Sequence, residues 1–160
     1  MQQVTEQFSS ATSRKTMWDE SVEELITQLA APKGTVGILY TSEDLAPFLG
    51  KMLDQLRLKT GVTDWSCASG YGTISHTEEV FGESSATVIV LDLPPDAYKV
   101  FSGNADVGTL LSDKESEWLA EATMPLAISH VDPRHTGAMD AISNLVETTG
   151  SFLIGGLTVA

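Results

Sequence analysis

The fold class is indicated by one apolar run, Thr35-Val-Gly-Ile-Leu-Tyr-Thr41. A strand shows alternate side chains to its two faces, and this run is apolar on both of them. A strand whose two faces are both apolar is expected to be buried on both sides, which is typical of a central strand in a parallel sheet. Gly34 and Ser42 bound the run. We therefore predict a buried central strand over residues 35–41.

A helix and a second strand are predicted directly after this run. Apolar residues recur at helical spacing from Leu45 to Leu56, and the helix is expected to begin near Asp44, with Pro47 in its first turn. A glycine ends the helix, and residues 64–68 suit a strand. Strand, helix and strand in succession form a βαβ unit, whose crossover is almost always right-handed.

The flanking segments extend the same pattern. On the amino side, residues 2–12 alternate like an edge strand, and apolar residues between 18 and 29 form one face of a helix. On the carboxyl side, residues 73–74 are expected to pair with a strand over 86–93, whereas residues 98–101 suit either a short strand or a loop. Four later elements are predicted: a short helix opened by a capping box at Ser112 and Glu115, a strand over 126–131, a helix over 138–146 and a strand over 151–154.

These elements predict an α/β fold with a mixed, largely parallel sheet, βαβ units and helices packed on the sheet. The 160 residues are enough for one domain with a buried core, and the hydrophobic share of 42% is ordinary for a globular protein. We expect a single domain over residues 1–160. The last strand runs into a predicted double-glycine turn, Gly155-Gly156, and we expect more protein to follow after residue 160.

The composition argues against several classes of function. The formal net charge of −13 repels phosphate backbones and anionic lipid headgroups, so we expect neither nucleic-acid binding nor membrane binding. Cys67 is the only cysteine, which excludes an internal disulfide. The amino terminus lacks the basic and apolar regions of a signal peptide, and the uncharged run 151–160 is about half of a membrane-spanning helix. We expect a cytoplasmic protein.

Four segments resemble, in order and spacing, the N-terminal domain of the FIST family, named for F-box and intracellular signal-transduction proteins. They are Val36-Gly-Ile-Leu-Tyr-Thr-Ser42, Ser66-Cys-Ala-Ser-Gly-Tyr-Gly-Thr73, Asp132-Pro133 and Phe152-Leu-Ile-Gly-Gly-Leu157. The resemblance covers about residues 34–158. It implies a sensory module for a small ligand, with amino acids among the suggested ligands, and a second, C-terminal FIST domain beyond residue 160. It leaves the signalling partner unknown, because no output domain or F-box is visible.

A ligand site can be placed from geometry as well. In open α/β sheets, ligands bind outside the carboxyl ends of the parallel strands. Four such ends can be read from the predicted strands, and they are largely the segments that carry the resemblance. Hydroxyl groups, one carboxylate and several glycines there suit a small polar ligand. The predicted ligand-binding residues are Thr41, Ser42, Cys67, Ser69, Gly70, Gly72, Asp132, Gly155 and Gly156. In the competing interpretation, the glycines only permit tight turns.

Catalytic and metal-binding interpretations are weaker. Cys67 would need a base to form a thiolate, and the nearby His76 is followed by two glutamates that disfavour one. His130, Asp132 and His135 could ligate a transition metal, but their spacing fits no metalloenzyme signature, and Asp132 before a proline suits an Asx turn. The fragment Gly70-Tyr71-Gly72 lacks the third glycine and the following helix of a dinucleotide site. We expect no catalytic residue, metal or cofactor.

The sequence therefore predicts a small-ligand-binding sensory module. An interaction scaffold without a small ligand is the main alternative, and an enzyme that uses Cys67 or the cluster at 130–135 is the weaker one. A deep polar pocket would favour the sensor, and a broad exposed apolar patch would favour the scaffold. The cysteine enzyme requires a base such as His76 within about 4 Å of the thiol.

Overall fold

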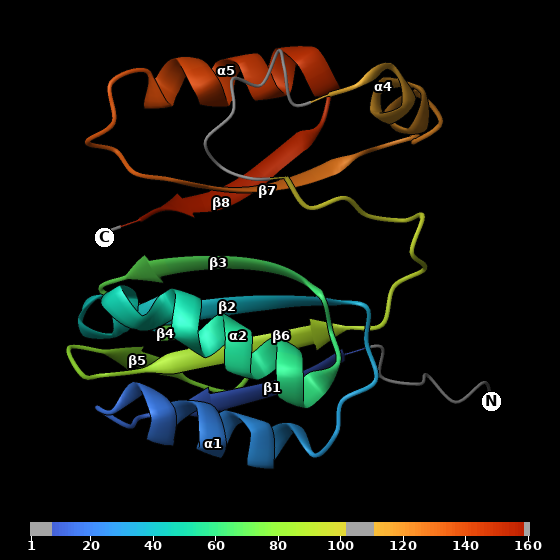
Figure 1. The fold of residues 1–160 in the computed structure, drawn as a ribbon. Coiled ribbons are helices and arrows are strands. Elements are labelled where there is room, and N and C mark those ends of the chain that lie inside the picture. The colour runs from blue at the N-terminus through green and yellow to red at the C-terminus, as the bar shows by residue number, and fades with distance from the viewer. Residues whose placement is uncertain (1–7, 102–110, 159–160) are drawn as a thin grey trace. The chain divides into compact units, whose positions relative to one another are not determined.

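The computed structural model describes residues 8–101 and 111–158 (Figure 1). The described residues form two compact units that divide near residue 100. Each unit combines helices with strands, so the expected α/β class is confirmed. Within the described residues, no helix is both long and apolar enough to cross a membrane.

The four-stranded sheet of the N-terminal unit is mixed, with the strand order β1-β6-β2-β3. Its strands are β1 (Phe8–Ser13), β2 (Val36–Ser42), β3 (Asp64–Gly70) and β6 (Ala86–Leu91). Strands β2 and β3 are parallel, as the predicted βαβ unit requires, whereas β6 is antiparallel to both of its neighbours. The expectation of a largely parallel sheet is therefore wrong here. A run that is apolar on both faces indicates a central strand, but it does not set the direction of the neighbours.

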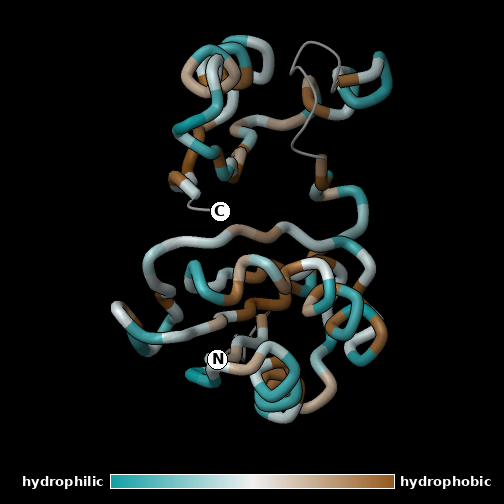
Figure 2. Tube along the Cα trace, turned by 60° about the vertical axis from the view of Figure 1, so that its left-hand side comes forward, coloured by the Kyte–Doolittle hydropathy of each residue, from teal (hydrophilic) through white to brown (hydrophobic). Residues whose placement is uncertain are grey.

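Helices α1 (Trp18–Leu29) and α2 (Leu49–Thr60) cover one face of this sheet (Figure 1). Figure 2 shows that hydrophobic residues concentrate between these helices and the sheet. The largest core side chains with almost no exposure are Leu25, Leu39, Leu45, Met52, Leu56, Val88 and Val90. Because side chains alternate along a strand, Leu39 and Thr41 of β2 face the helices, and Tyr40 and Ser42 face the opposite side.

The segment after β2 forms two short helices in place of the single predicted α-helix. Glu43–Phe48 is a 3-10 helix, labelled η1, and α2 begins only at Leu49. Pro47 lies inside η1, and a proline lacks the N–H of a regular α-helix and disfavours the α conformation of the preceding residue. The other end agrees with the prediction, because Gly61 caps α2 with a φ of +75°.

Strands β4 (Gly72–Ile74) and β5 (Glu79–Phe81) form an antiparallel hairpin. The predicted pairing of residues 73–74 with β6 is wrong, because β1 and β2 already occupy both edges of β6. The hairpin lies on the face of the four-stranded sheet that the helices leave uncovered (Figure 1). Its turn is held by Ser75, whose Oγ accepts hydrogen bonds from the N–H groups of Thr77 and Glu78 at 3.2 and 3.1 Å.

The C-terminal unit contains the second predicted βαβ unit. Helix α4 (Asp113–Ala120) begins with the expected capping box at Ser112 and Glu115. Strands β7 (Leu126–Val131) and β8 (Phe152–Leu157) are parallel and are joined by α5 (Ala138–Thr149). Strand β8 continues through both glycines, so they lie in a strand and not in the predicted turn. Residues 98–101 form a loop.

Few side chains of the C-terminal unit are buried. Among its described residues, only Ala138 and Ser151 are buried. One face of the β7–β8 sheet is apolar and exposed, because the paired residues of the two strands present Leu126 with Phe152 and Ile128 with Ile154. This unit therefore has an apolar face but little core of its own.

Candidate ligand site

Four strand ends meet at one edge of the four-stranded sheet. The carboxyl ends of β2 and β3 are adjacent, because Ser42 pairs with Gly70 in parallel register. Strands β1 and β2 are both antiparallel to β6, so β1 runs in the direction of β2 and ends at the same edge. Strand β6 runs the other way and enters the sheet at this edge with Ala86. The edge therefore collects three carboxyl ends and the loop that precedes β6.

An open pocket of about 400 Å³ lies at this edge. One wall consists of residues that end β2 or follow it, and the other of residues that follow β3 or precede β6. The pocket is lined by Ser42, Glu43, Asp44, Tyr71, Gly82, Glu83 and Ser84. Three of these side chains carry carboxylates, three carry hydroxyl groups and none is basic, so the pocket is polar and acidic.

Asp44 joins the two walls of the pocket. Its carboxylate accepts a hydrogen bond from Ser42 Oγ at 2.6 Å and a second one from Ser84 Oγ on the opposite wall. Burial is the largest single influence and raises the pKa of Asp44, but the hydrogen bonds from Ser42, from Ser84 and from two backbone N–H groups together outweigh it. The pKa of Asp44 therefore lies below its ordinary value, and the side chain is ionised at neutral pH.

Ser42 fixes the wall on the β2 side. It is only 4% exposed, and its Oγ also accepts a hydrogen bond from the Ser85 N–H at 2.9 Å. The backbone N–H of Ser42 in turn donates to the Ser85 carbonyl at 2.8 Å. The end of β2 is thus bound to the loop before β6 by main chain and side chain together.

The rim of the pocket is more open. Tyr71 is 67% exposed, and Glu83 forms an ion pair of 3.4 Å with Arg14, which follows β1. Arg14 also binds Glu78 at 2.7 Å, and this hydrogen bond is the main reason why the pKa of Arg14 is raised. Glu43 has no ion pair with any described residue.

Three predicted ligand residues lie on the other face of the sheet. Thr41, Cys67 and Ser69 alternate with the residues of the pocket side and face the helices. Cys67 packs against the core, and burial raises the pKa of its thiol although the Arg57 charge lowers it. The hydrogen bond of His76 goes to Ser10, with 2.7 Å between Nδ1 and Oγ. The base that a cysteine enzyme requires is therefore not supplied by His76.

The predicted glycines of the N-terminal unit flank Tyr71. A Cβ at Gly72 would lie 2.3 Å from the Val80 carbonyl oxygen, so the close approach of β4 and β5 requires glycine there. A Cβ at Gly70 would meet its nearest atom at 3.4 Å, which is ordinary contact. Packing thus accounts for Gly72, whereas Gly70 pairs with Ser42 and does not itself line the pocket.

The remaining predicted ligand residues belong to the C-terminal unit. Asp132 accepts hydrogen bonds from the backbone N–H and the guanidinium of Arg134, each at 2.9 Å, which confirms the predicted Asx turn and holds the pKa of Asp132 below its usual range. Gly155 has a φ of +149°, and a Cβ there would lie 1.8 Å from the Ser129 carbonyl oxygen. Gly156 has open space around it. In the part of the chain that the structure describes, no three His, Cys, Asp or Glu side chains are grouped to hold a metal ion.

Several lining residues were not predicted from the sequence. Glu43 and Asp44 follow β2 directly, so a wider application of the carboxyl-end rule would have included them. Glu83 and Ser84 precede a strand, and only the antiparallel direction of β6 brings them to this edge. No local sequence pattern indicates that direction.

Comparison of the chain with protein-family models, curated protein sequences and solved structures gives no match. The FIST resemblance therefore rests on the four quoted segments and stays a prediction.

Proposed function

We propose that the chain is a small-ligand-binding sensory module whose ligand carries a positively charged amino group. The proposal depends on one observation, the pocket at the strand ends. Its lining combines Glu43, Asp44 and Glu83 with three hydroxyl groups and contains no basic side chain. Its position agrees with the general rule that ligands of open α/β sheets collect outside the strand ends.

An ammonium group suits this lining. Asp44 is ionised and already held in place by Ser42 and Ser84, so binding need not order it. The Tyr71 ring at the rim offers a cation–π contact of about 0.5–1 kcal/mol at an exposed site. An exposed charge pair contributes at most about 1 kcal/mol. Charge contacts with the three carboxylates and one cation–π contact together give at most about −4 kcal/mol, so we expect a dissociation constant on the order of 1 mM or weaker.

The resemblance to FIST N-terminal domains supports a sensory role and makes amino acids one class of candidate ligand. In this proposal, a second FIST domain and a signalling partner receive the signal. Binding would change the equilibrium between two arrangements of the domains. The ligand can shift that equilibrium only to the extent that it binds one arrangement more tightly than the other.

The test is a thermal-shift titration at pH 7 with n-butylamine, n-butanol and butyrate, together with the common amino acids. The first three compounds share a carbon chain and differ in charge. A ligand at ten times its dissociation constant adds about 1.4 kcal/mol if it binds only the folded state, which raises Tm by roughly 3–8 °C. We expect a saturable rise with n-butylamine and with basic amino acids, and none with n-butanol or butyrate.

Two variants test whether n-butylamine binds in this pocket. Asp44→Asn removes the fixed charge of the pocket and should weaken n-butylamine binding about fivefold, the equivalent of one exposed charge contact. Asp92→Asn removes an exposed carboxylate just beyond the other end of β6 and should leave binding unchanged. Equal binding by Asp44→Asn and the unchanged protein would contradict this site, and no shift with any compound would contradict the ligand-binding function.

The exposed face of the β7–β8 sheet favours the interaction scaffold as a second candidate function. Leu126 and Phe152, which pair across the two strands, are 60% and 65% exposed. Contiguous exposed apolar residues of this kind mark protein-binding surfaces. If no compound in the titration binds, the scaffold becomes the better explanation.

A further inference from the structure

The β4–β5 hairpin, residues 72–81, is a small sheet of its own. Its two strands have three residues each and share no backbone ladder with the four-stranded sheet. Its outward side chains are largely exposed, with Ile74 at 70% and Phe81 at 74%. On its inward side Val80 and Thr73 are buried, but neither belongs to the core cluster that α1 and α2 form with the sheet. The hairpin is therefore attached to the molecule outside its main core.

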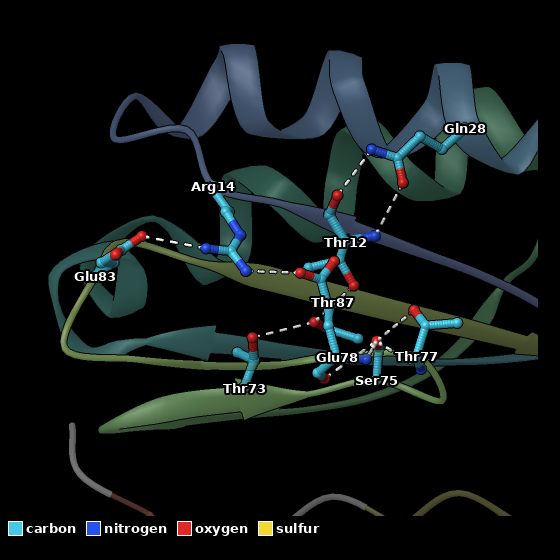
Figure 3. A network of polar contacts seen from close by, with 9 residues as sticks. All are labelled: Thr12, Arg14, Gln28, Thr73, Ser75, Thr77, Glu78, Glu83 and Thr87. Atoms are coloured by element: carbon cyan, nitrogen blue, oxygen red, sulfur yellow. Dashed lines mark hydrogen bonds and ion pairs between the residues drawn. The ribbon is translucent and has the colours of Figure 1, made fainter.

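The attachments of the hairpin to the sheet are mainly polar (Figure 3). At its base, Thr87 Oγ1 of β6 donates to Thr73 Oγ1 at 3.1 Å. At its turn, the guanidinium of Arg14 binds Glu78 at 2.7 Å, and His76 is hydrogen-bonded to Ser10. The side chains of Arg14 and Glu78 are 51% and 38% exposed, so water and salt compete for this ion pair. An element held by exposed polar contacts and few apolar ones opens more readily than a core element.

The pocket lies between the sheet and the flanks of this hairpin. Ser42 and Asp44 belong to β2 and η1, which are part of the main core unit, whereas Tyr71 directly precedes β4 and Glu83 follows β5. Arg14 binds Glu78 at the hairpin turn and Glu83 on the pocket wall at the same time. Arg14, which follows β1, thus connects the hairpin turn with a residue that lines the pocket, and Figure 3 shows its contacts with Glu78 and Glu83.

We propose that the β4–β5 hairpin is a lid that opens independently of the four-stranded sheet and that Arg14 is its latch. The inference deepens the proposed function and rests on it for the ligand. Closure places Tyr71 and Glu83 opposite Asp44 and completes the pocket. Opening carries Tyr71 and Glu83 away from Asp44, because they flank the hairpin, while the hydrogen bonds of Asp44 to Ser84 and of Ser42 to Ser85 stay in place. A ligand that contacts both walls then favours the closed hairpin, and the position of the hairpin reports occupancy.

The first experiment measures amide hydrogen exchange of the full chain without ligand. Amides of residues 72–81 should exchange faster than those of β2 and α2. Arg14→Gln and Glu78→Gln should each accelerate hairpin exchange about two- to fivefold, the range for one exposed ion pair, with β2 and α2 unchanged. The double variant should match Arg14→Gln, because that substitution already removes the contact with Glu78. Raising NaCl to 1 M should accelerate hairpin exchange in the unchanged protein but not in Arg14→Gln.

The matched control is Arg57→Gln, which breaks an exposed ion pair with Asp54 on α2 and should leave the hairpin unaffected. The lid proposal is contradicted if the hairpin amides exchange as slowly as the core amides. It is also contradicted if Arg14→Gln leaves the exchange rate of the hairpin unchanged. These outcomes do not depend on any ligand, so they are separate from a failure of the proposed function, which would appear as an absence of binding by every compound in the titration.

The second experiment repeats the exchange with 10 mM n-butylamine. If n-butylamine binds in the thermal titration, it should slow hairpin exchange severalfold and leave α2 unchanged, and n-butanol should have no effect. Binding of n-butylamine without any slowing of the hairpin would overturn the coupling of lid and pocket.

Discussion

Asp44 is positioned by two serines that lie far apart in the sequence. Ser42 is two residues before it and Ser84 is forty residues after it, and both donate to its carboxylate. A carboxylate that accepts several hydrogen bonds is stabilised in its charged form, which explains why its pKa is lowered in spite of partial burial. The same two bonds join the pocket walls, so the charge of Asp44 and the shape of the pocket depend on each other.

This arrangement predicts a pH-dependent contribution to stability. Because the pKa of Asp44 is lower in the folded state, its contribution is fully present above the unfolded pKa of about 4 and is lost as the pH falls through the folded pKa. Asp44→Asn should lower the free energy of unfolding by roughly 1 kcal/mol at pH 7, after discounting for solvent exposure. In urea unfolding, the difference should shrink below pH 4. A constant difference from pH 7 to pH 3 would contradict this explanation, and Asp92→Asn is the control.

The predicted ligand residues stay a prediction, but the structure shows where the strand-end rule places them. Ser42, which the rule selected, lines the pocket and pairs with Gly70 in the parallel register of β2 and β3. The rule also selected Thr41 and Ser69, because it marks a strand end without saying which of two alternating side chains faces the ligand. It missed Ser84, which reaches the pocket because β6 pairs with β2, more than forty residues earlier in the sequence.

For helices and strands too, features that the local sequence determines could be predicted, whereas features that depend on distant segments could not. Helix α1 and both βαβ units follow from periodicity and glycine stops, and the structure has them close to their predicted bounds except at the start of α2, where a 3-10 helix replaces the first turns. The partners of β6 could not be predicted, because its apolar run suits any central strand and the choice between β1, β2 and β4 depends on the whole sheet. The antiparallel direction of β6 then determines which loop reaches the pocket.

The β7–β8 pair allows a matched test of its two glycines. Gly155→Ala should disrupt the pairing, because the new Cβ would collide with the Ser129 carbonyl and the φ of +149° disfavours side chains. The cost should be about 1–3 kcal/mol, and amides of β7 and β8 should exchange correspondingly faster. Gly156→Ala, with open space around position 156, should have little effect. Equal effects of the two substitutions would show that close packing is not the reason for Gly155.

The two units of the molecule differ in how much they bury. The N-terminal unit encloses a cluster of fully buried side chains, whereas only Ala138 and Ser151 are buried among the described residues of the C-terminal unit. A two-stranded sheet covered by one or two helices has little apolar burial to offset the entropy of ordering its chain. The expectation of one domain over residues 1–160 stays a prediction, and the distribution of buried residues between the two units is uneven.

This difference predicts unequal protection along the chain. Amides of β7, β8 and α5 should exchange on the order of a hundredfold faster than those of α2 and β6, which corresponds to a difference of about 2.8 kcal/mol in opening free energy. Hydrogen exchange followed by mass spectrometry of the full chain measures both sets together. Equal protection in the two units would show that the C-terminal unit opens only when the whole molecule unfolds.

The position of β6 also sets the order in which the sheet can assemble during synthesis. Strands β2 and β3 belong to one βαβ unit and can pair once residue 70 has left the ribosome. Strand β1 pairs with β6 alone among the described residues, so it has no partner until residues 86–91 have emerged. In the interval its edge is open to other chains, and unpaired strand edges are where nascent proteins aggregate. The earliest strand of this sheet thus gains its backbone partner only when the latest one has been made.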